Sequence, residues 1–182
     1  MALNYTLLNV VDVESTCWMP RESKPSGAES EIIEVGIVQC NMLTQEVVKS
    51  DSIMIKPIEA GISPFCTELT TLTQADVDKG ITYAEACAML KKEYRSDQIA
   101  WASHGDYDRE MFVKNSKRRG VPYPFNKTHF NVKAINTLKL RKKAGFGVER
   151  ALQYYGMQFE GTPHRGIDDA KNIARLLFKI LA

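Results

Sequence analysis

The chain has 182 residues, 44% of them hydrophobic, and a net charge of +2 at pH 7. This length and apolar content fit one globular domain spanning residues 1–182, and so small a charge does not by itself indicate a nucleic-acid binder. No apolar run approaches the length that a bilayer requires and the N-terminus lacks a secretory signal, so we expect a soluble, cytoplasmic protein. Four widely separated cysteines indicate reduced thiols rather than a disulfide framework or a zinc site: Cys17, Cys40, Cys66 and Cys87.

The first half of the chain predicts three strands followed by short helices. Apolar and β-branched runs predict strands at Tyr5–Glu14, Glu31–Cys40 and Val47–Ile55, joined as an antiparallel meander, with a loop over Cys17–Ser30 after the first. Pro64, Thr73 and Thr82 then stand where helices would begin. The predicted helices are Phe65–Leu72, a second that Thr73 caps and Gly80 ends, and Tyr83–Tyr94.

In the second half, strands alternate with helices. We predict strands at Gln98–Ser103 and Thr128–Val132, and helices from the turn after the fourth strand to about Arg119, near Ala134–Lys143, at Val148–Tyr155 and at about Arg165–Leu181. A meander followed by this alternation indicates an α/β fold with a mixed sheet covered by helices.

Two acids in the first predicted strand are unexpected for a buried strand. Asp12 and Glu14 interrupt an otherwise apolar run, and residues two apart on a strand point to the same face. Two carboxylates so placed repel each other, and each tends to take up a proton unless a cation compensates them. The pair therefore predicts a divalent-metal site on this strand.

A second acidic pair follows the fourth predicted strand, at the edge where open α/β sheets usually place ligands. Either Asp106 or Asp108 could instead only cap the next helix. Asp108 precedes Met111 and Phe112 by three and four residues, which directs it toward the sheet, whereas Asp106 can point to water. This argument favours Asp108 as the functional acid and does not exclude Asp106.

A third acidic pair opens the last predicted helix. Asp169 precedes Ile173 and Leu176 by four and seven residues and so borders the buried stripe, whereas Asp168 falls on the polar side. Asp169 is therefore the better candidate ligand. His164 lies in the preceding loop, and histidine is the residue type suited to proton transfer near neutral pH, although a lone loop histidine is most often only a surface residue.

This ordered set of acids and one histidine resembles the DEDDh family of 3′-to-5′ exonucleases, which have an RNase H-like fold. More narrowly, the chain resembles the Eri1 and KapD-like branch, whose members trim RNA 3′ ends. The matching segments are Asp12–Trp18, Glu31–Gly36, Phe65–Thr70, Gly105–Asp108 and His164–Ala174. The branch usually has glycine at Thr71 and often tryptophan at His104. The resemblance implies an RNase H-like mixed five-stranded sheet, a three-strand meander plus parallel strands, flanked by helices.

The resemblance also implies hydrolysis of phosphodiester bonds from the 3′ end, with release of nucleoside 5′-monophosphates. Two Mg²⁺ or Mn²⁺ ions would activate a water and stabilise the leaving oxygen. Asp12 would bridge both ions, Glu14 and Asp169 would complete the site of the water-binding ion, and Asp108 would act largely through a metal-bound water. Neutral His164 would be the general base, a role that suits histidine because the reference pKa of this residue type is about 6.5.

The family further implies contacts to the 3′-terminal nucleotide. Phe65 and Leu69 would stack on it and Glu68 would lie near its 3′-hydroxyl, although Phe65 and Leu69 could instead only anchor a short helix to the core. Trp101 is a further candidate contact, but it belongs to a central strand, which slightly favours core packing over base contact. Arg165, beside His164, is a candidate phosphate partner. The remaining candidate contacts are Thr16 and Thr67.

Two basic clusters, within residues 114–119 and 139–143, could bind the substrate backbone, but such clusters are more often solvated helix ends. The small net charge favours short single strands or 3′ overhangs over long duplexes as substrates. The family resemblance favours RNA 3′ ends, with DNA as an alternative. Two other functions stay open: a KapD-like interaction or inhibitor module with the same fold, and a proofreading subunit acting on DNA. Clustered carboxylates argue against a pure binding protein.

Overall fold

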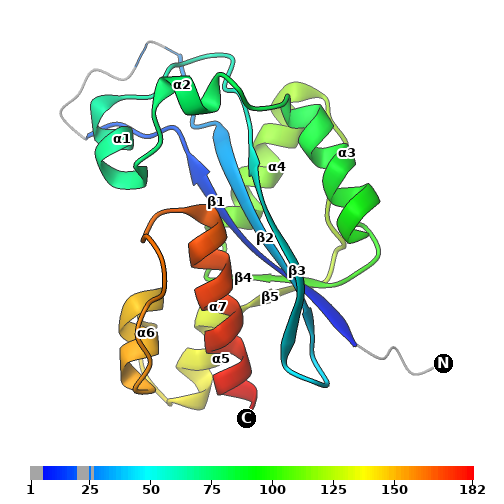
Figure 1. Cartoon of the computed structure of the whole chain (residues 1–182), viewed down its shortest axis with the longest axis vertical. Coiled ribbons are helices and arrows are strands. Elements are labelled where there is room, and N and C mark those ends of the chain that lie inside the picture. Colours follow the sequence, from blue (N-terminus) through cyan, green and yellow to red (C-terminus); the bar gives the residue numbers. More distant parts are fainter. Residues whose placement is uncertain (1–5, 20–24, 26) are drawn as a thin grey trace.

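The computed structural model describes residues 6–19, 25 and 27–182, which form a mixed sheet with helices on both faces (Figure 1). The five strands lie in the order β3-β2-β1-β4-β5. The antiparallel meander comprises β1 (Leu7–Ser15), β2 (Ile32–Asn41) and β3 (Glu46–Met54), and the short strands β4 (Trp101–Ser103) and β5 (His129–Asn131) continue the sheet parallel to β1. The predicted fold class is confirmed.

The helices fall into three groups (Figure 1). α3 (Tyr83–Tyr94) and α4 (Tyr107–Arg119) lie on one face of the sheet, α5 (Val132–Lys139), α6 (Val148–Tyr154) and α7 (Gly166–Leu181) lie on the other, and α1 (Pro64–Thr70) and α2 (Gln74–Val77) lie beyond the end of β1. The side chains of Ser63, Thr73 and Thr82 each accept a backbone N–H at the start of α1, α2 or α3, which fixes where these helices begin. Among the described residues, no helix is both long and apolar enough to cross a membrane.

Alternation along β1 divides its side chains between the two cores. Val11 and Val13 belong to the core under α3 and α4, and Leu8 and Val10 belong to the core under α5, α6 and α7. Because residues two apart share a face, the even-numbered acids of the same strand continue the row that faces α7. The fold thus directs two charged side chains toward the start of that helix.

Several element boundaries differ from the prediction. The fourth strand begins at Trp101 rather than at Gln98, because the N–H groups of Gln98 and Ile99 bond the carbonyl of Arg95 in a turn after α3. The helix predicted near Ala134–Lys143 spans Val132–Lys139, since Asn131 caps it at the N–H of Ala134 and the chain turns left-handed at Arg141, where φ is 52°. Tyr5, where the first strand was expected to begin, lies outside the described residues.

Candidate active site

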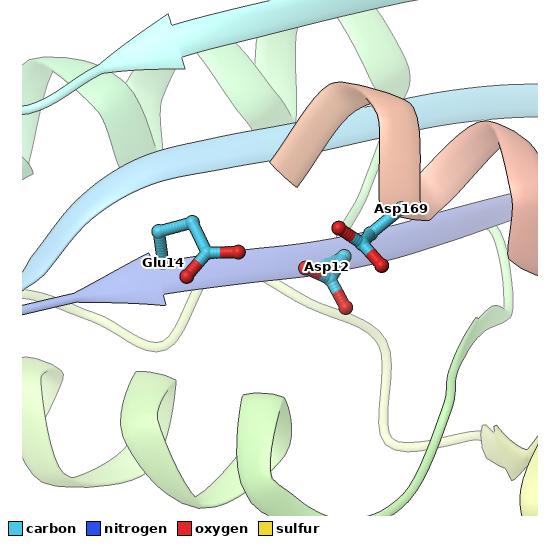
Figure 2. A group of neighbouring side chains, drawn as sticks. All are labelled: Asp12, Glu14 and Asp169. Atoms are coloured by element: carbon cyan, nitrogen blue, oxygen red, sulfur yellow. The ribbon is translucent and has the colours of Figure 1, made fainter. Parts of the chain in front are cut away.

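Three carboxylates from two elements converge where α7 begins on the sheet. Asp12 and Glu14 extend from β1, and the first turn of α7 contributes Asp169 (Figure 2). One carboxylate oxygen from each residue lies within 4.8 Å of the others. Oxygen ligands at this spacing suit hard divalent cations such as Mg²⁺ and Mn²⁺. The structure therefore brings together three of the four acids that the sequence predicted as ligands.

The electrostatics of this cluster also favour a cation. Burial, reinforced by the neighbouring carboxylates, raises the pKa of Asp12 well above its usual range. Burial and the charges of Asp169 and Glu34 raise the pKa of Glu14 to about 8, and burial raises the pKa of Asp169 to about 6. A cluster of this kind must either take up protons or bind a positive charge. The donor set thus fits a divalent metal.

Asp108, the fourth predicted ligand, approaches β1 from α4. It lies in the first turn of α4, is buried, and accepts the N–H of Val13 at 3.0 Å. Val13 separates Asp12 from Glu14, so the Asp108 carboxylate lies against the β1 backbone between the two acids. Burial raises the pKa of Asp108 to about 6, and its charge contributes to the raised pKa of Asp12.

Asp106 has different surroundings. Its side chain is half exposed, pairs with Arg109 at 3.1 Å and accepts a hydrogen bond from the Asn131 amide at 2.9 Å. It occupies the N-cap position of α4, although its side chain makes no capping hydrogen bond. The inward direction deduced for Asp108 from helical phase therefore agrees with the structure, while Asp106 belongs to a surface network.

His164 lies in the loop directly before α7. Its side chain is exposed and its backbone is left-handed, with φ at 61°. The N–H of His164 donates to Asp169 at 2.7 Å, so the acid ties the histidine backbone to the helix. Asp168 accepts the N–H of Thr162 at 2.9 Å and orders the same loop from its other end. As predicted, Asp169 faces the acid cluster, and Asp168 instead faces the loop.

α1 contacts the chain at and just past the acid-bearing end of β1. Cys66 donates to the carbonyl of Ser15 at 3.5 Å, and Ser63 donates to the carbonyl of Cys17 at 2.6 Å. Cys66 is buried in the core under this helix. Outside that core, the helix leaves the predicted nucleotide contacts partly or fully exposed: Phe65, Thr67, Glu68 and Leu69. Their exposure leaves them accessible to a ligand, and their contact with a nucleotide remains a prediction.

Two predicted substrate contacts are wrong. Trp101 has no exposed surface, stacks on Phe125 at a ring-centroid distance of 4.4 Å and donates its indole N–H to the carbonyl of Asn126. Thr16 is also fully buried, and its hydroxyl accepts the N–H of Glu31 at 2.9 Å. Neither side chain can reach a nucleotide. The alternative weighed for Trp101, core packing, is the one that holds.

Arg165 is engaged within the protein. Its guanidinium donates to Glu34 through Nε at 3.1 Å and through Nη2 at 3.4 Å. Its contact with a phosphate remains a prediction. Glu34 was not singled out from the sequence, although it lies in the matching segment Glu31–Gly36. The signal that could have identified it is a charge within a strand whose neighbours are almost all apolar.

The two basic clusters differ in pairing. Arg118 pairs with Glu59 and Arg119 pairs with the buried Glu31, so half of the α4 cluster is already neutralised. In the second cluster, Lys139 donates to the carbonyl of Ile180 at the end of α7. Neither cluster is part of the acid site, and their role in backbone binding remains a prediction.

Comparison with known proteins agrees with this geometry. The RNase T-type family model, described as "Exonuclease", matches residues 10–177. The chain belongs to the DEDDh exonuclease family. It is 32% identical to the 3′-5′ exonuclease Snipper of Drosophila melanogaster, over 97% of this chain and 70% of that protein. It is 29% identical to human 3′-5′ exoribonuclease 1, over 97% of this chain but only 53% of the human protein.

A solved structure shares the architecture of this DEDDh domain. The nuclease domain of 3′hExo, a DEDDh family member bound to rAMP, superposes with a TM-score of 0.85 at 26% identity, covering 98% of this chain and 93% of that one. The fold and the acid cluster of this chain are therefore those of a DEDDh exonuclease.

Proposed function

We propose that the chain is a metal-dependent 3′-to-5′ exoribonuclease that removes nucleoside 5′-monophosphates from single-stranded RNA. The observation that carries the proposal is the convergence of Asp12, Glu14 and Asp169 within 4.8 Å in a chain of this family. Human 3′-5′ exoribonuclease 1 is named for activity on RNA, and the 3′hExo nuclease domain binds rAMP. These two relatives favour RNA over DNA as the polymer for this chain.

The residues of the site would have different roles in hydrolysis. Asp12, Glu14 and Asp169 would hold two divalent cations directly, and Asp108 would do so through water. When bound, Mg²⁺ or Mn²⁺ ions lower the pKa of a water molecule and compensate charge on the phosphate. His164 accepts the proton of the attacking water at its exposed imidazole. The N–H that His164 donates to Asp169 holds this base at the edge of the metal site.

The partly exposed face of α1 offers a place for the terminal nucleotide. Phe65, Glu68 and Leu69 occur at helical spacings of three and four, so they share one face beside the end of β1. Stacking on such a face contributes about 1 to 3 kcal/mol per base and tolerates any base. The enzyme would therefore act on RNA 3′ ends without strict sequence preference.

The test is incubation with single-stranded RNA and DNA of one sequence, labelled at the 3′ or the 5′ end, with Mg²⁺, Mn²⁺ or a chelator. We expect nucleoside 5′-monophosphates to be released from 3′-labelled RNA at once, a ladder of shortened products from 5′-labelled RNA, and no reaction with the chelator. Faster hydrolysis of the DNA strand would contradict the RNA assignment. Folded protein that released no mononucleotide from either polymer would contradict the exonuclease function.

The role of His164 is tested separately. His164→Ala should lower kcat by about 10²- to 10⁴-fold, the contribution of a general base, and leave Mn²⁺ binding intact. Lys171→Ala, an exposed change on the next turn of α7, is the matched control and should retain full activity. A His164→Ala enzyme with unchanged kcat would require another base.

A further inference from the structure

Glu34 is a buried carboxylate that belongs to the same neighbourhood as the acid site but faces a different set of partners. It lies on β2 directly opposite Glu14 in the strand register and has no exposed surface. Its oxygens accept the hydroxyl of Ser52 at 2.6 Å, the N–H of Gly166 at 3.1 Å and the Nε–H of Arg165 at 3.1 Å. Glu34 therefore binds the first residues of α7.

The contact between β2 and α7 is unusually close at the same point. Gly36, two residues from Glu34 and on the same face, has no side chain beneath the helix, and a Cβ there would lie 1.9 Å from the carbonyl oxygen of Gly166. A Cβ on Gly166 would in turn lie 3.0 Å from the backbone nitrogen of Gly36 and 3.2 Å from the carbonyl oxygen of Asp12. Any loss of the Glu34 contacts would free the end of a helix that rests directly on the sheet.

The segment that Glu34 holds carries two groups of the reaction. Arg165 and Gly166 lie between His164 and Asp169 in the sequence, and the carbonyl of Arg165 accepts the N–H of Asp169 at 2.9 Å. His164 bonds back to the same acid at 2.7 Å. The proposed base and one proposed metal ligand therefore move with this segment, whereas Asp12 and Glu14 are fixed independently on β1.

We propose that Glu34 is a positioning residue that sets the distance between the acids of β1 and the start of α7, and so the places of Asp169 and His164. The inference rests on the proposed function. A carboxylate without exposure is costly to bury, and an apolar side chain could fill the same space. An apolar residue, however, could not accept hydrogen bonds from both the N–H of Gly166 and the guanidinium of Arg165.

The test compares Glu34→Gln with a matched control, Glu31→Gln. Glu31 is as deeply buried, at 1% exposure, and is paired with Arg119 as Glu34 is paired with Arg165. The carboxylate of Glu31, however, bonds the N–H groups of the loop at residues 58–60 and makes no hydrogen bond to α7. Both variants lose one buried ion pair, and only the first loosens the start of α7.

For Glu34→Gln we expect kcat on RNA to fall by about 10- to 100-fold with KM changed less than about twofold, as for misplaced reacting groups. Calorimetric Mn²⁺ titration of the metal-free protein should show affinity weakened by roughly 10-fold, because one ligand has shifted. Glu31→Gln should lower the melting temperature comparably while kcat and Mn²⁺ affinity stay as in the wild type.

Two results would overturn the positioning role. One is a Glu34→Gln protein with wild-type kcat and Mn²⁺ affinity, and the other is equal loss of both in Glu31→Gln, which would show a general effect of stability. The metal titration keeps this test apart from the proposed function. If the wild-type protein released no nucleotide, that function would fail, and the Mn²⁺ affinities of the two variants would still decide the role of Glu34.

Discussion

At the scale of single residues, the direction of a side chain decides which of two neighbouring acids belongs to the site. Asp108 is 4% exposed and bonded to the β1 backbone, whereas the side chain of Asp106 is 49% exposed and bonded to Arg109 and Asn131. The two residues differ by only two positions at the start of one helix. Their different burial predicts different consequences for the same substitution.

Asp108→Asn should lower kcat by about 10- to 100-fold, because it would remove a charge that the proposed metal site would use through water. Asp106→Asn should change kcat less than about twofold, since exposed ion pairs contribute little. The measurement is the rate of mononucleotide release at saturating Mg²⁺ for both variants side by side. If Asp106→Asn lowered kcat more than Asp108→Asn did, Asp106 would be the third acid of the site.

For single residues, helical periodicity predicts the direction of a side chain but not its contacts with residues distant in the sequence. Helical phase separated Asp169 from Asp168 because the periodicity of α7 is regular and its apolar face is well marked. The partners that Trp101 and Thr16 contact could not be deduced in this way, since Phe125 and Glu31 are distant in the chain and meet these residues only in the folded protein. Contacts that depend on tertiary neighbours are not encoded in local spacing.

At the scale of elements, the site depends on how α7 meets β2. The first residues of α7 lie on the backbone of β2 because Gly36 leaves room for them, and this contact brings Asp169 to the acids of β1. A methyl group at this position would meet a backbone carbonyl rather than a flexible side chain. The helix could escape the clash only by moving away from the sheet.

Gly36→Ala should therefore destabilise the protein by about 1 to 3 kcal/mol or more and abolish most of the nuclease activity. Gly147→Ala is the control: at this N-cap of α6 φ is −65° and an added Cβ meets nothing within 4 Å, so stability should change by less than about 1 kcal/mol. Urea unfolding of both variants measures the difference. Equal stability of the two variants would contradict the close approach of α7.

Element boundaries were predictable where a capping residue marks them and less so elsewhere. Tyr83–Tyr94 was predicted to the residue, because Thr82 begins α3 with a capping box. α1 ends at Thr70, two residues before the predicted end, where Thr71 adopts a left-handed φ of 63°. Glycine is the residue that suits this conformation, and the family usually has it there, so a threonine concealed the end of the helix.

At the scale of the whole molecule, the acid cluster couples metal binding to stability. Without metal, several carboxylates are held at raised pKa values, which means that the folded protein retains protons that the unfolded chain has released. The folded state then loses stability as pH rises from the usual pKa of a carboxyl group to its raised value. For Glu14 this window runs from 4.5 to about 8. A bound divalent cation replaces those protons and removes the loss.

The titration of His104 changes the stability in the opposite direction over part of this pH range. Burial lowers the pKa of His104 to about 4, so its contribution to stability increases as pH rises to the usual value of 6.5 and is complete above it. Burial lowers the pKa of His129 in the same direction. Above pH 6.5 the titration of these histidines no longer changes the stability, and the carboxylate of Glu14, whose pKa is raised to about 8, dominates the change.

The melting temperature of the metal-free protein should accordingly fall by roughly 4 °C or more between pH 6.5 and 8, given the size of the chain and one group titrating near 8. With saturating Mg²⁺ the same range should be nearly flat, so stabilisation by the metal grows with pH. Thermal unfolding in chelator and in Mg²⁺, at several pH values, gives both curves.

Glu14→Gln should flatten the metal-free curve, because the uncharged amide has no proton to lose. A metal-free melting temperature that stayed constant or rose across this range would mean that the carboxylates are compensated by another positive charge within the protein.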